Sequence, residues 1–138
     1  MGNLSLQDAF AVFGGKPANR FHSVSAMAAD GTEMILSCSA KRFTHPTRGI
    51  LRYEDTLSRG DPQAAHARSL GEHLTQAREA NLPIRMIVIT EHQDAAGETT
   101  RAIHVRVDLV GKIVEFDGER FVIDFVRNTQ PAQRSARR

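Results

Sequence analysis

Residues 84–92, IRMIVITEH, form the stretch of sequence that decides the fold. The stretch is dense in β-branched side chains and is apolar on both of its alternating faces. This pattern is typical of a strand in the centre of a sheet, because a strand with one wet face alternates apolar and polar residues. We therefore predict a central strand here and expect the flanking sequence to supply its neighbours.

The residues after this strand predict three more strands. Residues 93–98 read as a polar loop, and residues 99–108 alternate apolar and polar side chains as a half-buried strand does. Segments 109–116 and 119–127 flank Asp117-Gly118, which is a favoured two-residue hairpin turn. The C-terminal half of the chain is therefore expected to be antiparallel.

The residues before the central strand predict a second hairpin and a further strand. Residues 21–28 and 33–40 flank Asp30-Gly31, the same type of turn signal. A loop is expected over residues 41–49, and a short strand over residues 50–53. The number of tight turns again favours antiparallel pairing.

Two helices are predicted from caps and apolar spacing. The first follows Ser5 as its N-cap, carries one apolar stripe, and stops at a pair of glycines. The second begins at Asp61, followed by Pro62 at the first helical position, and runs to about Ala80. Its inward side chains are expected to be Leu70, Leu74 and Ala77.

The turn registers predict which side chains meet across each hairpin. In the first hairpin Met27 lies opposite Met34 on a mostly apolar face that should look inward, and the other face is polar enough for solvent or a ligand. In the second hairpin Glu115 lies opposite Arg120 on the outer face. The strand residues expected in the core are Leu36, Cys38, Phe121, Ile123 and Phe125.

These elements predict an α+β fold in which two helices cover a mainly antiparallel sheet of six to seven strands, curled or partly closed into a barrel. The chain has 138 residues, of which 41% are hydrophobic and 25% charged, as expected of one globular domain. We expect a single α+β domain over residues 1–127. Residues 128–138 contain no large apolar side chain and are expected to form a disordered basic tail.

Composition also limits the compartment and the class of protein. No apolar run approaches the roughly 18–20 residues that a membrane span needs, and the first eight residues do not resemble a secretory signal. The single cysteine, Cys38, excludes an internal disulfide and a zinc site made of cysteines alone. We therefore expect a cytoplasmic protein that does not contact a membrane.

The net charge of +2 conceals two basic regions. Four arginines follow Asp124 with no acid among them, and residues 16–52 hold six lysines and arginines against two acids. A basic patch on a nearly neutral body suits a polyanionic partner. The candidate nucleic-acid-binding residues are Lys16, Arg20, His22, Lys41, Arg42, His45, Arg48, Arg52 and Tyr53.

The first hairpin explains how these residues would meet. Residues 20–22 open its first strand and residues 40–42 end its second, so a two-residue turn brings the two basic groups side by side. Arginine and lysine would hold phosphates, while His22 and Tyr53 would contact a base or sugar. We predict a non-enzymatic module that binds nucleic acid, with DNA as the expected partner and a modified base or a DNA structure as the feature it reads. No cofactor, metal ligand or catalytic residue is expected.

Two stretches carry a resemblance to known proteins. SLQDAFAVFGGKPANRFHSVSA, residues 5–26, and DLVGKIVEFDGERFVIDF, residues 108–125, resemble a small uncharacterised bacterial domain associated with restriction and DNA-handling proteins. Similar sequences are expected to have tryptophan where this chain has Phe21 or Val24, so an aromatic contact of that domain is missing here. The order of elements also resembles the PUA-like barrels, which implies reading of RNA or of modified DNA bases.

Two other functions stay open. One is a protein-interaction or assembly subunit that forms a homodimer through an uncovered sheet edge. The other is a small metal-dependent hydrolase or nuclease, for which the consecutive acids Glu54 and Asp55 are the best pair. None of the six histidines has the close spacing of metal ligands, and Cys38 is expected to be a buried small hydrophobe rather than a nucleophile.

Overall fold

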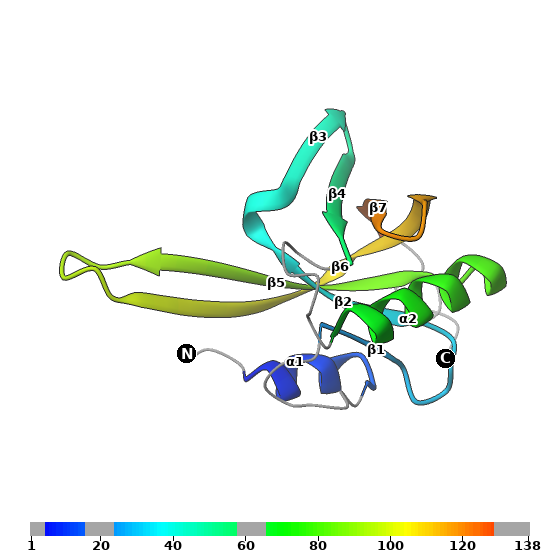
Figure 1. Ribbon diagram of the computed structural model, residues 1–138, viewed down its shortest axis with the longest axis horizontal. Helices are drawn as coiled ribbons and strands as arrows, with labels where there is room; N and C mark the ends of the chain where they lie inside the picture. Colours follow the sequence, from blue (N-terminus) through cyan, green and yellow to red (C-terminus); the bar gives the residue numbers. More distant parts are fainter. Residues whose placement is uncertain (1–4, 16–23, 58–65, 129–138) are drawn as a thin grey trace.

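The computed structural model describes residues 5–15, 24–57 and 66–128, which form one open mixed sheet with two α-helices and a short 3₁₀ helix (Figure 1). In chain order the elements are α1 (Leu6–Val12), β1 (Ser25–Met27), β2 (Met34–Ser39), η1 (Ala40–Arg42), β3 (Phe43–Thr47), β4 (Ile50–Thr56), α2 (His66–Ala80), β5 (Ile84–Gln93), β6 (Thr99–Phe116) and β7 (Arg120–Arg127). The seven strands lie in the order β1-β2-β5-β6-β7-β4-β3. The predicted α+β fold with a curled sheet is therefore confirmed, and the sheet does not close into a barrel.

The sheet carries a hydrophobic core on each face. On one face the buried residues of β2, β5, β6, β7 and β4 pack with Leu70, Leu74 and Ala77 of α2. On the other face Ile35 and Ile87 lie beneath α1 and its apolar stripe. The second face of the first hairpin, expected to be polar and exposed, is therefore covered, because α1 folds back over it.

Several local predictions are confirmed by the contacts. The Ser5 hydroxyl accepts a hydrogen bond from the Asp8 backbone N–H at 3.0 Å, so Ser5 is the N-cap of α1. Met27 pairs with Met34 in the expected antiparallel register. Arg120 Nη1 donates to Glu115 Oε1 at 2.8 Å across the outer face of the second hairpin.

Three features differ from the sequence-based expectation. Strands β2 and β5 pair in parallel, because the long connection through β3, β4 and α2 lets the chain return in the same direction. The predicted loop 41–49 contains η1 and the edge strand β3, which pairs with β4. Residues 99–116 form one bent strand rather than two, with register breaks opposite β5 and β7.

Arg85 lies at the break in the register between β5 and β6. It lies on β5 where the pairing jumps from Ile84 to Met86, and its Nη2 donates to the Val107 carbonyl at 2.8 Å. Its guanidinium also lies 3.4 Å from Glu33 and 4.9 Å from the centroid of the Phe13 ring. Through these contacts Arg85 connects β6, at its bend, to the turn before β2 and to the end of α1.

Candidate nucleic-acid interface

The 3₁₀ helix η1 is fixed at the carboxyl end of β2, where β2 separates from β5. The last pair between these parallel strands joins Ser39 to Ile89, and η1 then contacts both β5 and β4 as the chain turns toward β3. The Ser39 hydroxyl accepts from the Lys41 backbone N–H at 3.4 Å, and the Ser39 N–H donates to the Tyr53 hydroxyl at 3.1 Å. These bonds set the direction in which the side chains of η1 leave the body.

Tyr53 supports this turn from inside the core. Its ring is fully buried and lies 5.0 Å from the Phe43 ring, centroid to centroid. Its hydroxyl donates to Asp55 Oδ2 at 2.6 Å, and Asp55 Oδ1 lies 3.5 Å from Arg42 Nε. The predicted role of Tyr53 as a base or sugar contact is therefore corrected: a ring with no exposed surface positions η1 instead.

Four of the predicted binding residues form an exposed set that we call the β3 cation surface: Lys41, Arg42, His45 and Arg48. Lys41 and Arg42 lie on η1, His45 on β3, and Arg48 in the turn to β4, where Gly49 takes the positive φ of 85° that the turn needs. Residues 40–50 contain no Asp or Glu. The hairpin that carries these cations projects from the sheet body (Figure 1).

Arg52, predicted as a phosphate ligand, is held by an acid of the neighbouring strand. Its Nε and Nη2 donate to the two carboxylate oxygens of Asp124 at 2.7 and 2.9 Å. This bidentate hydrogen bond raises the pKa of the Arg52 guanidinium and neutralises its charge locally. Arg52 is therefore held more fully than Arg42, whose ion pair with Asp55 is longer at 3.5 Å, although Arg52 and Thr44 face each other across the β3–β4 pair.

A hollow lies on each side of η1. One of about 370 Å³ is bordered by Ser39, Lys41, Thr90, Glu91, His92 and Arg101, among others, and one of about 570 Å³ by Ser39, Lys41, Arg42, Phe43, Thr44 and Glu54. Lys41 and Ser39 border both hollows. The polar lining suits a charged or strongly hydrogen-bonding ligand.

Sequence reasoning missed Arg101 and His92 as members of this region. They lie on β6 and β5, far from residues 39–44 in the chain, and meet η1 only because β5 pairs in parallel with β2. The polar residues 93–98 predicted a loop between β5 and β6 but not the register of the two strands. In the observed register Arg101 lies opposite Glu91. These two residues could have been predicted only if the parallel pairing of β2 with β5 had been predicted first.

Lys16, Arg20 and His22 lie outside the described residues, as do residues 129–138 of the predicted tail. The predicted convergence of residues 20–22 with residues 40–42 stays a prediction. Asn128, the last described residue, donates its backbone N–H to the Asp108 carbonyl at 2.7 Å.

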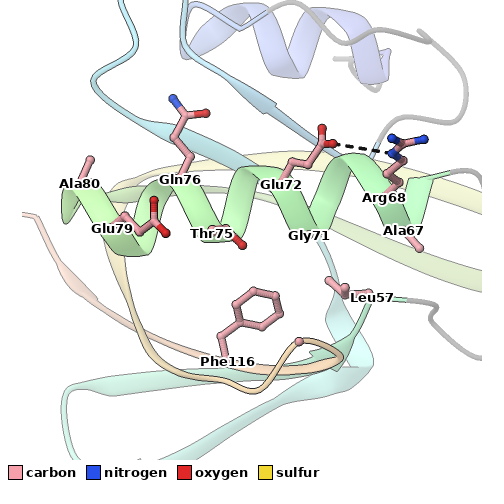
Figure 2. Close-up of a pocket in the computed structure, with 11 residues that line it drawn as sticks. Leu57, Ala67, Arg68, Gly71, Glu72, Thr75, Gln76, Glu79, Ala80 and Phe116 are labelled. Atoms are coloured by element: carbon pink, nitrogen blue, oxygen red, sulfur yellow. Dashed lines mark ion pairs between the residues drawn. The ribbon is translucent and has the colours of Figure 1, made fainter.

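A third hollow is an apolar groove of about 700 Å³ between α2 and the β6–β7 turn (Figure 2). Figure 2 shows Phe116 and Leu57 facing the helix side that carries Gly71 and Thr75. A Cβ on Gly71 would lie 3.1 Å from Leu57 Cδ1, so this glycine lets the strand end approach the helix. Its aliphatic and aromatic lining differs in chemistry from the polar hollows beside η1.

A metal site requires a group of ligand side chains, and a reactive cysteine requires an exposed thiol. Within residues 5–15, 24–57 and 66–128, no group of three His, Cys, Asp or Glu side chains is placed to hold a metal ion. Cys38 is fully buried in the core, as expected of a small hydrophobe. Neither helix in the described part of the chain is long and apolar enough to cross a membrane.

Comparison with known proteins assigns no class to this fold and site. No protein-family model matches the chain, and no curated protein or solved structure matches it. The assignment of function therefore depends on the chemistry of the surface itself.

Proposed function

We propose that the chain binds nucleic acid through the β3 cation surface. The observation that carries this proposal is an acid-free run, residues 40–50, whose Lys41, Arg42, His45 and Arg48 side chains are all exposed on one projecting hairpin and its 3₁₀ helix. Lysine and arginine in such a group neutralise phosphates and release the counterions around them. Tyr53 and Asp55 hold η1, which carries Lys41 and Arg42, from within the core.

The form of the hairpin favours side-chain contact over strand addition. β3 is an edge strand of the sheet, and Pro46, its fourth residue, has no N–H to offer a further strand. A two-stranded ribbon with basic side chains has the dimensions to enter the DNA major groove. DNA, the partner expected from the sequence, is therefore the polyanion that we propose.

The polar hollows refine this proposal. The hollow bordered by Lys41, His92 and Arg101 has a volume of about 370 Å³, within the range of small-ligand sites. It lies beside the phosphate-binding cations, so an unstacked base or its sugar could enter it while the backbone stays on the hairpin. Reading of a modified base is the finer form of the proposal.

The test is oligonucleotide binding by fluorescence anisotropy as a function of salt. Duplex DNA, single-stranded DNA, RNA and duplexes with a modified base are compared, with Lys41→Ala, Arg48→Ala and the matched control Arg68→Ala on α2. Each lost phosphate contact is expected to reduce the salt slope on duplex DNA by about 0.9, while Arg68→Ala leaves it unchanged. Absence of binding by the native chain at low salt would overturn the proposal, as would equal slopes for all three variants.

A further inference from the structure

The tip of the long β5–β6 hairpin has no neighbouring strand in the described sheet. β5 leaves β2 after Ile89, and β6 joins β7 only from Leu109 onward. Between these points Thr90–Gln93 pair with Thr99–Ala102 and with nothing else in the sheet. Figure 1 shows this part, which we call the arm, extending away from the body in a direction different from the β3–β4 hairpin.

The arm ends in a well-ordered turn. Asp94 Oδ1 accepts from the backbone N–H groups of Ala96 and Glu98, each at 2.9 Å, and Asp94 N donates to the Glu98 carbonyl at 3.0 Å. Gly97 takes the positive φ of 86° required to close the turn. The shape of the tip is therefore specified, although residues 91–101 are exposed.

An isolated two-stranded ribbon is marginally stable in water, because it has no third strand or core beneath it. Both edges of the arm also present backbone groups that can accept a further chain. The base of the arm lies beside η1, but its outer part has a specified turn and no third strand, and this combination favours a partner that covers the arm.

The charge of the tip indicates which partner fits. Residues 93–100 contain the acids Asp94 and Glu98 and no lysine or arginine, whereas residues 40–50 contain Lys41, Arg42 and Arg48 and no acid. The tips of the two hairpins of one chain point in different directions (Figure 1), although the base of the arm borders the hollow beside Lys41. A second copy presents the complementary surface, and two-fold symmetry makes the contact twice, which doubles its area and its charge pairs.

We infer that the acidic arm of one copy docks on the β3 cation surface of a second copy in a reciprocal dimer. Each arm thereby gains the neighbouring chain that its own sheet lacks. The contact covers the cations to which we assign phosphate binding, so dimer and polyanion compete for one surface. The inference itself depends only on the arm and on the two charge patterns, and it holds or fails independently of nucleic-acid binding.

The test is sedimentation velocity over protein concentrations up to about 100 µM, at low and at high salt, since screening weakens charge pairs at exposed interfaces. The native chain is expected to dimerise at low salt and dissociate at high salt. Glu98→Lys alone and Arg48→Glu alone are each expected to weaken self-association by about tenfold or more. An equimolar mixture of the two variants restores every charge pair of the reciprocal dimer and is expected to sediment as a dimer.

Restoration in the mixture also excludes misfolding as the cause of the single-variant losses. A matched variant, Glu72→Lys on α2, is expected to dimerise like the native chain. A native chain that is monomeric throughout the concentration range, or a mixture that stays monomeric, overturns the inference. If Arg48→Glu loses oligonucleotide binding while the native chain stays monomeric, the inference fails and the proposed function survives.

Discussion

Tyr53 donates its hydroxyl hydrogen to Asp55 at 2.6 Å while the same oxygen accepts the Ser39 N–H at 3.1 Å. Through these two bonds a residue of β4 holds the end of β2 and the start of η1. Asp55 in turn lies 3.5 Å from Arg42, which reaches it from the surface. A short buried chain of polar groups thus connects the sheet core to the cations of the candidate interface.

Replacing Tyr53 by Phe tests this connection. The ring keeps its packing against Phe43, but Asp55 loses a donor and the Ser39 N–H loses its acceptor. The free energy of unfolding is expected to fall by about 1–3 kcal/mol, because a hydrogen bond to a carboxylate and one from a backbone N–H are lost together, while Asp55 keeps the Thr56 N–H and Arg42. Urea unfolding measures the change, and faster amide exchange over residues 39–42 would show that η1 is affected. A change below about 0.5 kcal/mol without faster exchange contradicts the positioning role.

Arg85 allows a second stability test, at the bend of β6. Arg85→Ala removes the bond to the Val107 carbonyl and the ion pair with Glu33, and it leaves a space beside Phe13. Its side chain is only 9% exposed, but Glu33 is 28% exposed, so the expected loss is about 2–3 kcal/mol rather than that of a fully buried pair. Arg85→Met keeps most of the volume and removes the buried Nε that has no hydrogen-bond partner among the described residues.

Urea unfolding of the two Arg85 variants separates charge from packing. Arg85→Met is expected to lose no more than about half as much stability as Arg85→Ala, because replacing a buried charge by an apolar group is often close to neutral. Equal losses for both variants would show that the polar contacts of the guanidinium with Val107 and Glu33, and not its volume, dominate.

His73 predicts a pH dependence of stability. Burial lowers the pKa of His73 on α2, with Glu72 acting in the opposite direction, and His73 Nδ1 shares a hydrogen bond of 2.7 Å with the Ser25 hydroxyl. The unfolded chain therefore binds this proton more readily than the folded chain. The contribution of the neutral His73 ring to the free energy of unfolding is fully present above the ordinary histidine pKa of about 6.5. It is lost as the pH falls below that value toward the lowered pKa of the folded chain.

The measurement compares unfolding free energies at pH 7.5 and 5.5 for the native chain, His73→Gln, and the control His104→Gln on the exposed side of β6. The native chain and the control are expected to lose more stability on acidification than His73→Gln does. Equal losses in all three chains would show that His73 does not contribute to the acid sensitivity.

The two hairpins could be predicted from the sequence, whereas the parallel pairing of β2 with β5 could not. Turn residues such as Asp30-Gly31 and Asp117-Gly118 specify antiparallel neighbours, and both hairpins form. The first has the predicted register, whereas in the second Glu115 lies opposite Val122 rather than Arg120. The parallel pairing of β2 with β5 is invisible to local patterns, because it joins residues about 50 positions apart through a crossover. That crossover brings His92 and Arg101 to η1.

The same limit applies to the candidate site. Exposure of Lys41, Arg42, His45 and Arg48 agrees with their polarity and their position outside any apolar stripe. The pairing of Arg52 with Asp124 could not be predicted, since it depends on β4 lying beside β7, its neighbour in the sheet but not in the chain. Composition identifies cations, whereas only the strand order tells which of them are already paired.

The substitution Asp124→Asn tests whether the pairing of Arg52 with Asp124 keeps Arg52 from binding phosphates. The substitution keeps the shape of the side chain but removes the negative charge that holds Arg52 through two hydrogen bonds. Arg52 lies across from Thr44 on β3 and would then add its charge to the β3 cation surface. Duplex DNA is expected to bind more tightly, with a salt slope that is larger by about 0.9 for one added phosphate contact. The double variant Arg52→Ala, Asp124→Asn is expected to return to the native slope, because it removes the released cation. An Asp124→Asn chain with the native slope would show that phosphates do not reach this side of the hairpin, and the interface would then be confined to η1 and the β3–β4 turn.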